Sequence, residues 1–71
     1  VSAERRLATM FGLSRAEARL AALLGSGVPL AEAAERLSIR YETARTQLKS
    51  IFVKTDTHRQ ADVVALFARL G

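Results

Sequence analysis

Residues 41–52 read YETARTQLKSIF, a stretch that combines a helical pattern of apolar residues with an excess of positive charge. On a helix with about 100° per residue, the predicted buried stripe consists of Ala44, Leu48, Ile51, Phe52 and Thr55. The opposite face carries Glu42, Arg45, Thr46, Lys49 and Val53. One flank between them carries Thr43, Gln47, Ser50 and Lys54. The polar face is therefore either an ordinary solvated surface or a surface that meets a negatively charged partner.

The excess positive charge is local to this part of the chain. The 71 residues include 11 Lys and Arg against 7 Asp and Glu, for a net charge of +4. Residues 40–60 hold five of the cations and two of the anions, so a net charge of +3 lies there. A small domain with a basic surface favours a polyanionic partner, and nucleic acid is the first candidate.

The composition predicts an all-α fold in one small domain. Ala, Leu and Arg are abundant, there is one Pro, and no segment alternates polar and apolar residues for long. We expect five helices: residues 3–11, Ser14 to the turn at Gly25–Gly27, residues 29–38, residues 41–54 and residues 59–70. The apolar stripe of the last helix is predicted to be Val63, Leu66, Phe67 and Leu70.

Several residues indicate where the helices begin and end. Ser14 and Glu17 have the spacing of a capping box, in which each side chain bonds the other residue's backbone N–H. Ser2 is expected to cap the first helix, which should end at Gly12. Gly27 is suited to the left-handed position that ends the second helix.

The link between the third and fourth helices is very short, since only SIR at residues 38–40 separates them. Two short helices joined in this way, the second of them basic, form the pattern of a helix-turn-helix. The major groove of DNA admits one helix, whose outward face then meets the base edges. This pattern favours DNA binding over a merely solvated polar face.

With these motifs in place, the chain resembles the LuxR-type (GerE-like) DNA-binding domain of bacterial transcription regulators over about residues 13–67. The matching residues are Leu13, Ser14, Glu17, Gly27, Ala34, Glu35, Leu37, Thr43, Ala44, Arg45 and Lys54. The resemblance implies a four-helix helix-turn-helix domain at residues 13–71. Residues 1–12 are expected to form an additional N-terminal helix or a linker from an upstream region.

The resemblance also implies a function and its partners. The recognition helix, Tyr41–Lys54, would bind double-stranded DNA at a roughly palindromic site, as a homodimer formed through the last helix. RNA polymerase is a further implied partner, and the bacterial cytoplasm, on the nucleoid, is the implied location. The implied base contacts are Arg45, Thr46 and Lys49. The implied phosphate contacts are Thr43, Gln47 and Lys54.

Four other residues carry an open alternative. Arg40 stands where the family has a small capping residue, and it either reaches a phosphate or leaves a frayed helix start. Arg59 either contacts phosphate or begins a solvated helix. Val64 and Ala68 lie off the core stripe of the last helix, so they form either a small dimer contact or an ordinary apolar surface.

Neither enzymatic chemistry nor a cofactor is expected. The chain has no Cys, one His, no Ser/His/Asp set and no glycine-rich phosphate loop, so we predict no catalytic residues and no metal site. Two rival functions stay open. The first is the promoter-reading module of a sigma factor, and the second is a helical adaptor whose basic helix binds an acidic protein.

Overall fold

The computed structural model of the chain describes residues 3–70 and contains, in that part, five helices and no strand. They are α1 Ala3–Phe11, α2 Arg15–Gly25, α3 Leu30–Arg36, α4 Tyr41–Thr55 and α5 Gln60–Leu70. The all-α prediction is thus confirmed. The expected cap Ser2 and the side chain of Leu70 lie outside the described residues. None of the helices within residues 3–70 combines the length and the apolar character that a membrane span requires.

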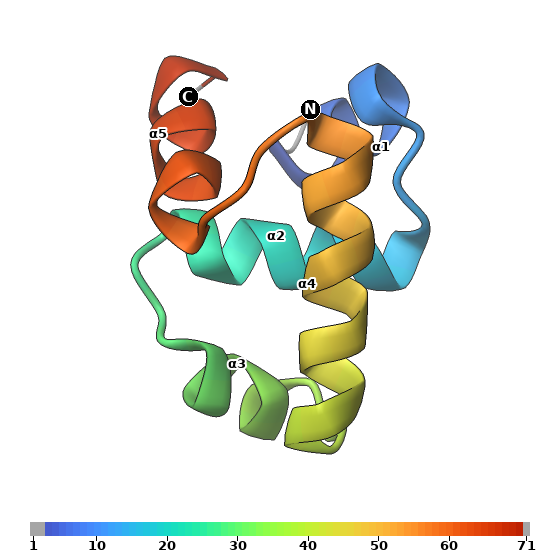
Figure 1. Cartoon of the computed structure of the whole chain (residues 1–71), viewed down its shortest axis with the longest axis vertical. Coiled ribbons are helices and arrows are strands. Elements are labelled where there is room, and N and C mark those ends of the chain that lie inside the picture. Colours follow the sequence, from blue (N-terminus) through green and yellow to red (C-terminus); the bar gives the residue numbers. More distant parts are fainter. Residues whose placement is uncertain (1–2, 71) are drawn as a thin grey trace.

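Helix α2 runs across the middle of the molecule, with α3 on one side of it and α1 and α5 on the other, while α4 crosses it (Figure 1). It contacts each of the other four helices. The largest fully buried side chains come from α1, α2, α4 and α5 and are Leu7, Leu20, Leu24, Ile51 and Val63. The core is therefore built around α2, and α1 shares it through Leu7.

The buried stripe predicted for α4 is confirmed. Ala44, Leu48 and Ile51 are buried, and Phe52 packs against the core while half-buried. Thr55 is also half-buried, and its hydroxyl donates a hydrogen bond of 2.7 Å to the Ile51 carbonyl. With this stripe turned inward, the polar face of α4 points to solvent.

The contact between α2 and α5 depends on Gly25. The ring of Phe67 lies so close to the Gly25 backbone that a Cβ atom there would overlap it. Phe67 is half-buried in this position, and Val63, one turn earlier, is fully buried. Val63 and Phe67 of the predicted apolar stripe thus pack into the core, and the small size of Gly25 allows the close approach of Phe67.

The first four helices end in the same way, with a residue in the left-handed region followed by a backward backbone hydrogen bond. The residues with positive φ are Gly12 (67°), Gly27 (91°), Ser38 (57°) and Asp56 (55°). After α3, for example, the Ile39 N–H bonds the Ala34 carbonyl at 3.0 Å, as in a Schellman motif. The predicted roles of Gly12 and Gly27 are confirmed, whereas Ser38 and Asp56 adopt this conformation without being glycine.

The ends of α3 differ from the prediction. The helix begins at Leu30, because Pro29 has the extended ψ of 152° and serves as the residue before the first turn. It ends at Arg36 rather than near Ser38, because the left-handed φ of Ser38 is incompatible with a continued helix. At the other boundary, α5 begins at Gln60, one residue after the predicted start at Arg59.

Helices α3 and α4 pack against each other and are joined by residues 37–40 alone. Leu37 and Ile39 in this turn are half-buried and pack against the core. The turn is therefore fixed by its own side chains, and the two helices form the short, rigid pair that the sequence predicts.

We expect Ser38→Gly to raise the free energy of unfolding by about 0.5–1 kcal/mol. The substitution removes a left-handed strain of about 1–2 kcal/mol, and the greater freedom of glycine in the unfolded chain offsets part of this gain. Gly27→Ala is the opposite substitution and serves as the control. It should lower stability by about 1 kcal/mol, because the φ of 91° at this position is unfavourable for alanine. Urea unfolding followed by circular dichroism measures both, and a loss of stability in Ser38→Gly would contradict this account of the turn.

Candidate nucleic-acid interface

The cations of the chain fall into two groups according to whether they already have a partner. Lys54 Nζ lies 2.7 Å from Glu17 Oε1, and Arg36 pairs with Glu32 within α3. A second group is exposed, and its side chains form no ion pair within residues 3–70; it includes Arg40, Arg45, Lys49 and Arg59. We call these four residues the unpaired cations.

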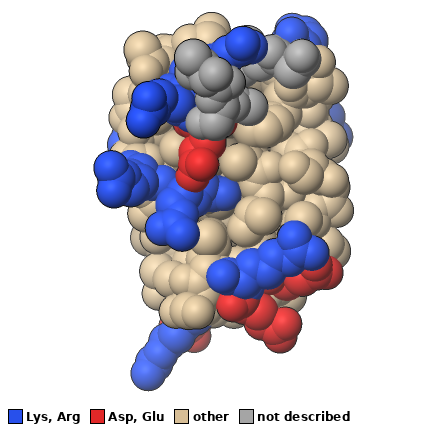
Figure 2. Space-filling model, turned by 180° about the vertical axis from the view of Figure 1, so that it is seen from behind, with Lys and Arg blue, Asp and Glu red and all other residues tan. Residues whose placement is uncertain are grey.

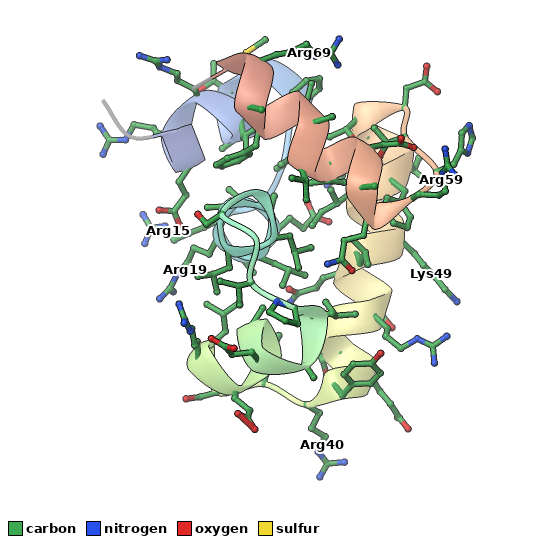
Figure 3. The ribbon with its side chains drawn as sticks, turned by 90° about the vertical axis from the view of Figure 1, so that its left-hand side faces the viewer. Arg15, Arg19, Arg40, Lys49, Arg59 and Arg69 are labelled. Atoms are coloured by element: carbon green, nitrogen blue, oxygen red, sulfur yellow. The ribbon has the colours of Figure 1, made fainter. Side chains whose placement is uncertain are left out.

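The predicted base-contacting residues lie together on the outer face of α4. Arg45, Thr46 and Lys49 are all exposed, and their spacing places them on adjacent turns of the helix, opposite the buried stripe. In Figure 3, Lys49 and Arg59 extend from the same side of the molecule. A surface that approaches α4 from this side therefore meets cations from α4 and from the start of α5.

Thr46 presents less of its hydroxyl than the sequence suggests. Its Oγ1 donates a hydrogen bond of 3.1 Å to the carbonyl of Glu42, one turn earlier in α4. This bond occupies the hydroxyl hydrogen, so the methyl group and the oxygen lone pairs are what Thr46 offers to a partner. The methyl group makes Thr46 a small apolar contact between two cations.

The flank of α4 turns from solvent toward α2 along its length. Thr43 is exposed, whereas Gln47 is half-buried, and its Oε1 is buried without a hydrogen-bond partner among the described residues. A phosphate oxygen only accepts hydrogen bonds, so the amide nitrogen of Gln47 is the atom that could serve a phosphate. Ser50 and Lys54, further along, both bond Glu17.

Glu17 links the start of α2 to the second half of α4. Its Oε1 accepts hydrogen bonds from the Ser14 N–H at 2.8 Å and from Lys54 Nζ at 2.7 Å. Its own N–H donates to Ser14 Oγ at 3.1 Å, so the predicted capping box is confirmed. The Glu17 side chain is only 10% exposed, against 36% for Lys54. Lys54 thus has a structural role that the sequence did not reveal, in addition to the phosphate contact that stays a prediction.

The environment of Glu17 lowers its pKa. Burial alone would raise the pKa, but hydrogen bonds from Lys54, Ser50 and the Ser14 backbone, together with the charge of Lys54, outweigh burial and bring the pKa from 4.5 to about 2. The carboxylate is therefore ionised at any pH at which the domain is expected to work.

The remaining predicted residues lie at helix ends or on α5. Arg40 immediately precedes α4 with extended backbone (ψ 151°) and forms no side-chain cap, as its chemistry implies. Arg59 precedes α5, and its N–H bonds Asp62 Oδ2 at 3.2 Å, which leaves its side chain free to extend outward. On α5, Val64 is half-buried and Ala68 is exposed.

Similarity to characterised proteins gives no further guide to this surface. No family model matches the chain, and no curated protein and no solved structure matches it at a significant level. Within residues 3–70, no group of His, Asp and Glu side chains is arranged to hold a metal ion. The assignment of the surface therefore rests on the arrangement of its own side chains.

We expect Glu17→Gln to lower the free energy of unfolding by about 3 kcal/mol at neutral pH. This is the stabilisation that corresponds to the lowering of the Glu17 pKa from 4.5 to about 2, and the variant loses it. A carboxylate with a lowered pKa stabilises the fold fully above its unfolded pKa. This stabilisation is lost as the pH falls from 4.5 toward 2, so the difference between wild type and variant should shrink over that window.

Urea unfolding of both proteins between pH 2 and pH 7 measures this difference. Glu32→Gln is the control, since it removes an exposed pair within α3 and should cost less than about 1 kcal/mol. A difference between wild type and Glu17→Gln that stays constant with pH would contradict the assigned role of Glu17.

Proposed function

We propose that this chain binds double-stranded DNA sequence-specifically, with α4 in the major groove, as the output module of a bacterial transcription regulator of the LuxR type. The observation that carries the proposal is the division of the cations. Lys54 and Arg36 are neutralised by partners within the fold, whereas Arg45 and Lys49 stand unpaired on the outer face of the second helix of a short-turn pair.

The chemistry of that face suits base recognition. The major groove is about 12 Å wide and takes one helix. Arg45 and Lys49 can donate to guanine O6 and N7, and a bidentate Arg contact is the strongest of these. Between them, Thr46 offers its methyl group to the methyl group of thymine, because its hydroxyl hydrogen is held by Glu42.

Phosphate contacts would hold α4 in register at both ends. Arg40 is a cation beside the N-terminus of α4, where the helix dipole disfavours positive charge unless an anion is also present. A DNA phosphate at this place would accept from Arg40 and from the free backbone N–H groups of the first turn. The further proposed phosphate contacts are Thr43, the amide nitrogen of Gln47, Arg59 and Lys54, whose ammonium group keeps other N–H donors beside the one bonded to Glu17.

The proposal includes a homodimer on a roughly palindromic site, since two-fold symmetry of the protein matches two half-sites. Val64 and Ala68 lie one turn apart on α5 and offer an apolar contact for a second copy. RNA polymerase as a further partner, and the bacterial nucleoid as the location, rest on the family resemblance alone.

Selection of binding sites from random duplexes tests the proposal and yields the half-site spacing. Against the selected duplex, Arg45→Ala should lose about 1–3 kcal/mol, and it should lose much less against a scrambled duplex. Arg15→Ala is the matched control, because Arg15 is also exposed but extends from the opposite side of the molecule (Figure 3). If no sequence is enriched, the protein does not read DNA sequence. That result would favour the rival function, a helical adaptor whose basic helix binds an acidic protein.

A pair of substitutions at Thr46 separates its methyl group from its hydroxyl. Thr46→Val keeps a methyl group in place and should bind the selected duplex within about 0.5 kcal/mol of wild type. Thr46→Ser keeps the hydroxyl and should lose about 1 kcal/mol, the scale of burying one methyl group. Fluorescence anisotropy measures both affinities. The reverse order of the two variants would show that the hydroxyl makes the contact.

A further inference from the structure

A second basic surface lies away from α4, in a groove between α1 and α2. The groove has a volume of about 520 Å³ and is lined by Glu4, Arg5, Ala8, Arg15, Ala18 and Arg19. Figure 2 shows Lys and Arg side chains gathered around an acidic one on the face that Figure 1 hides. In Figure 3, Arg15 and Arg19 extend from the side opposite Lys49 and Arg59. Arg19 also borders a small pocket with Ile39 and Gln47, so the groove adjoins the flank of α4 and lies away from its outer face.

Two arginines of the groove have no partner within the fold. Arg15 and Arg19 are exposed, and their side chains form no ion pair within residues 3–70. They are four residues apart on α2, so their side chains start about 6 Å from each other on one face. Arginine binds carboxylates through two parallel hydrogen bonds, so the pair is suited to two carboxylates at a similar spacing.

The floor of the groove is apolar. It is formed by Ala18, which is 2% exposed, and by the half-buried Ala8. Ala18 therefore offers almost no surface to a ligand, and the exposed arginines at the edges decide what the groove binds.

We propose that this groove binds an acidic peptide segment of a partner protein, with two carboxylates on Arg15 and Arg19. This proposal rests on the proposed function: a duplex seated on the outer face of α4 leaves Arg15 and Arg19 free, because they extend from the side opposite Lys49. The peptide and a duplex therefore bind at the same time.

The test uses a fluorescein-labelled peptide with blocked ends, Ala-Ala-Glu-Ala-Glu-Ala-Ala, whose two Glu side chains start about 7 Å apart on one face of an extended chain. A twin peptide has Gln in place of both Glu residues. Fluorescence anisotropy should show that the protein binds the acidic peptide and binds the twin at least tenfold more weakly. Arg15→Gln/Arg19→Gln should weaken binding of the acidic peptide roughly tenfold, the effect expected for two exposed ion pairs. Arg36→Gln/Arg69→Gln removes the same charge outside the groove and should leave this affinity within about twofold.

Three results would overturn the proposal: equal binding of the two peptides, equal losses in the two double variants, or displacement of the peptide by a duplex that saturates the protein. The first would show that the carboxylates are not recognised, and the second that only net charge matters. The third would place the peptide on a nucleic-acid surface. Arg15 and Arg19 are exposed, so circular dichroism should show an unchanged thermal midpoint in their double variant.

Discussion

The carboxylate of Glu17 joins two parts of the chain on which the proposed DNA surface depends. It caps the first turn of α2 through Ser14, and it receives the ammonium group of Lys54 from α4, 37 positions away in the sequence. A buried carboxylate without these donors would cost several kcal/mol, so the two helices are held in the one arrangement that supplies them. Because α2 contacts every other helix, this arrangement also sets which face of α4 points outward.

Local patterns in the sequence predicted most of the fold. The capping box at Ser14 and Glu17, the glycine ends at Gly12 and Gly27, and the buried stripe of α4 all depend on neighbours within about one helical turn. The left-handed φ of Ser38 was missed, because serine gives no local sign of it. The helix boundaries shifted by one or two residues for the same reason, since side chains and turns beyond the periodic pattern decide where a helix stops.

The candidate site was predictable in part. The outer face of α4 follows from periodicity alone, and Arg45, Thr46 and Lys49 lie on it as expected. The pairing of Lys54 depends on a contact between distant segments, which no periodicity reveals. Lys54 and Glu17 each had a complete local explanation, as a flank donor and as a cap, so nothing in the sequence pointed from one to the other. The groove at Arg15 and Arg19 also arises only when α1 packs on α2.

The division of the charges gives the two proposals a common physical basis. The pair of Lys54 with Glu17 joins α4 to α2, whereas exposed cations that form no ion pair within residues 3–70 lie on two opposite sides of a domain only 27 × 24 × 20 Å in extent. If one side holds DNA and the other an acidic peptide, the domain connects the two over a short distance. The connection needs no conformational change, because both surfaces are borne by α2 and by helices packed on it.

The most direct test of the central claim is to map a selected duplex on the protein by amide chemical shifts in ¹⁵N-labelled samples. The account predicts that the largest changes fall on the turn at residues 37–40 and on the outer face of α4, at Arg45, Thr46 and Lys49. The amides around Arg15 should change little. Changes concentrated in α1 and α2, with α4 unaffected, would contradict the claim that the unpaired cations of α4 form the DNA surface.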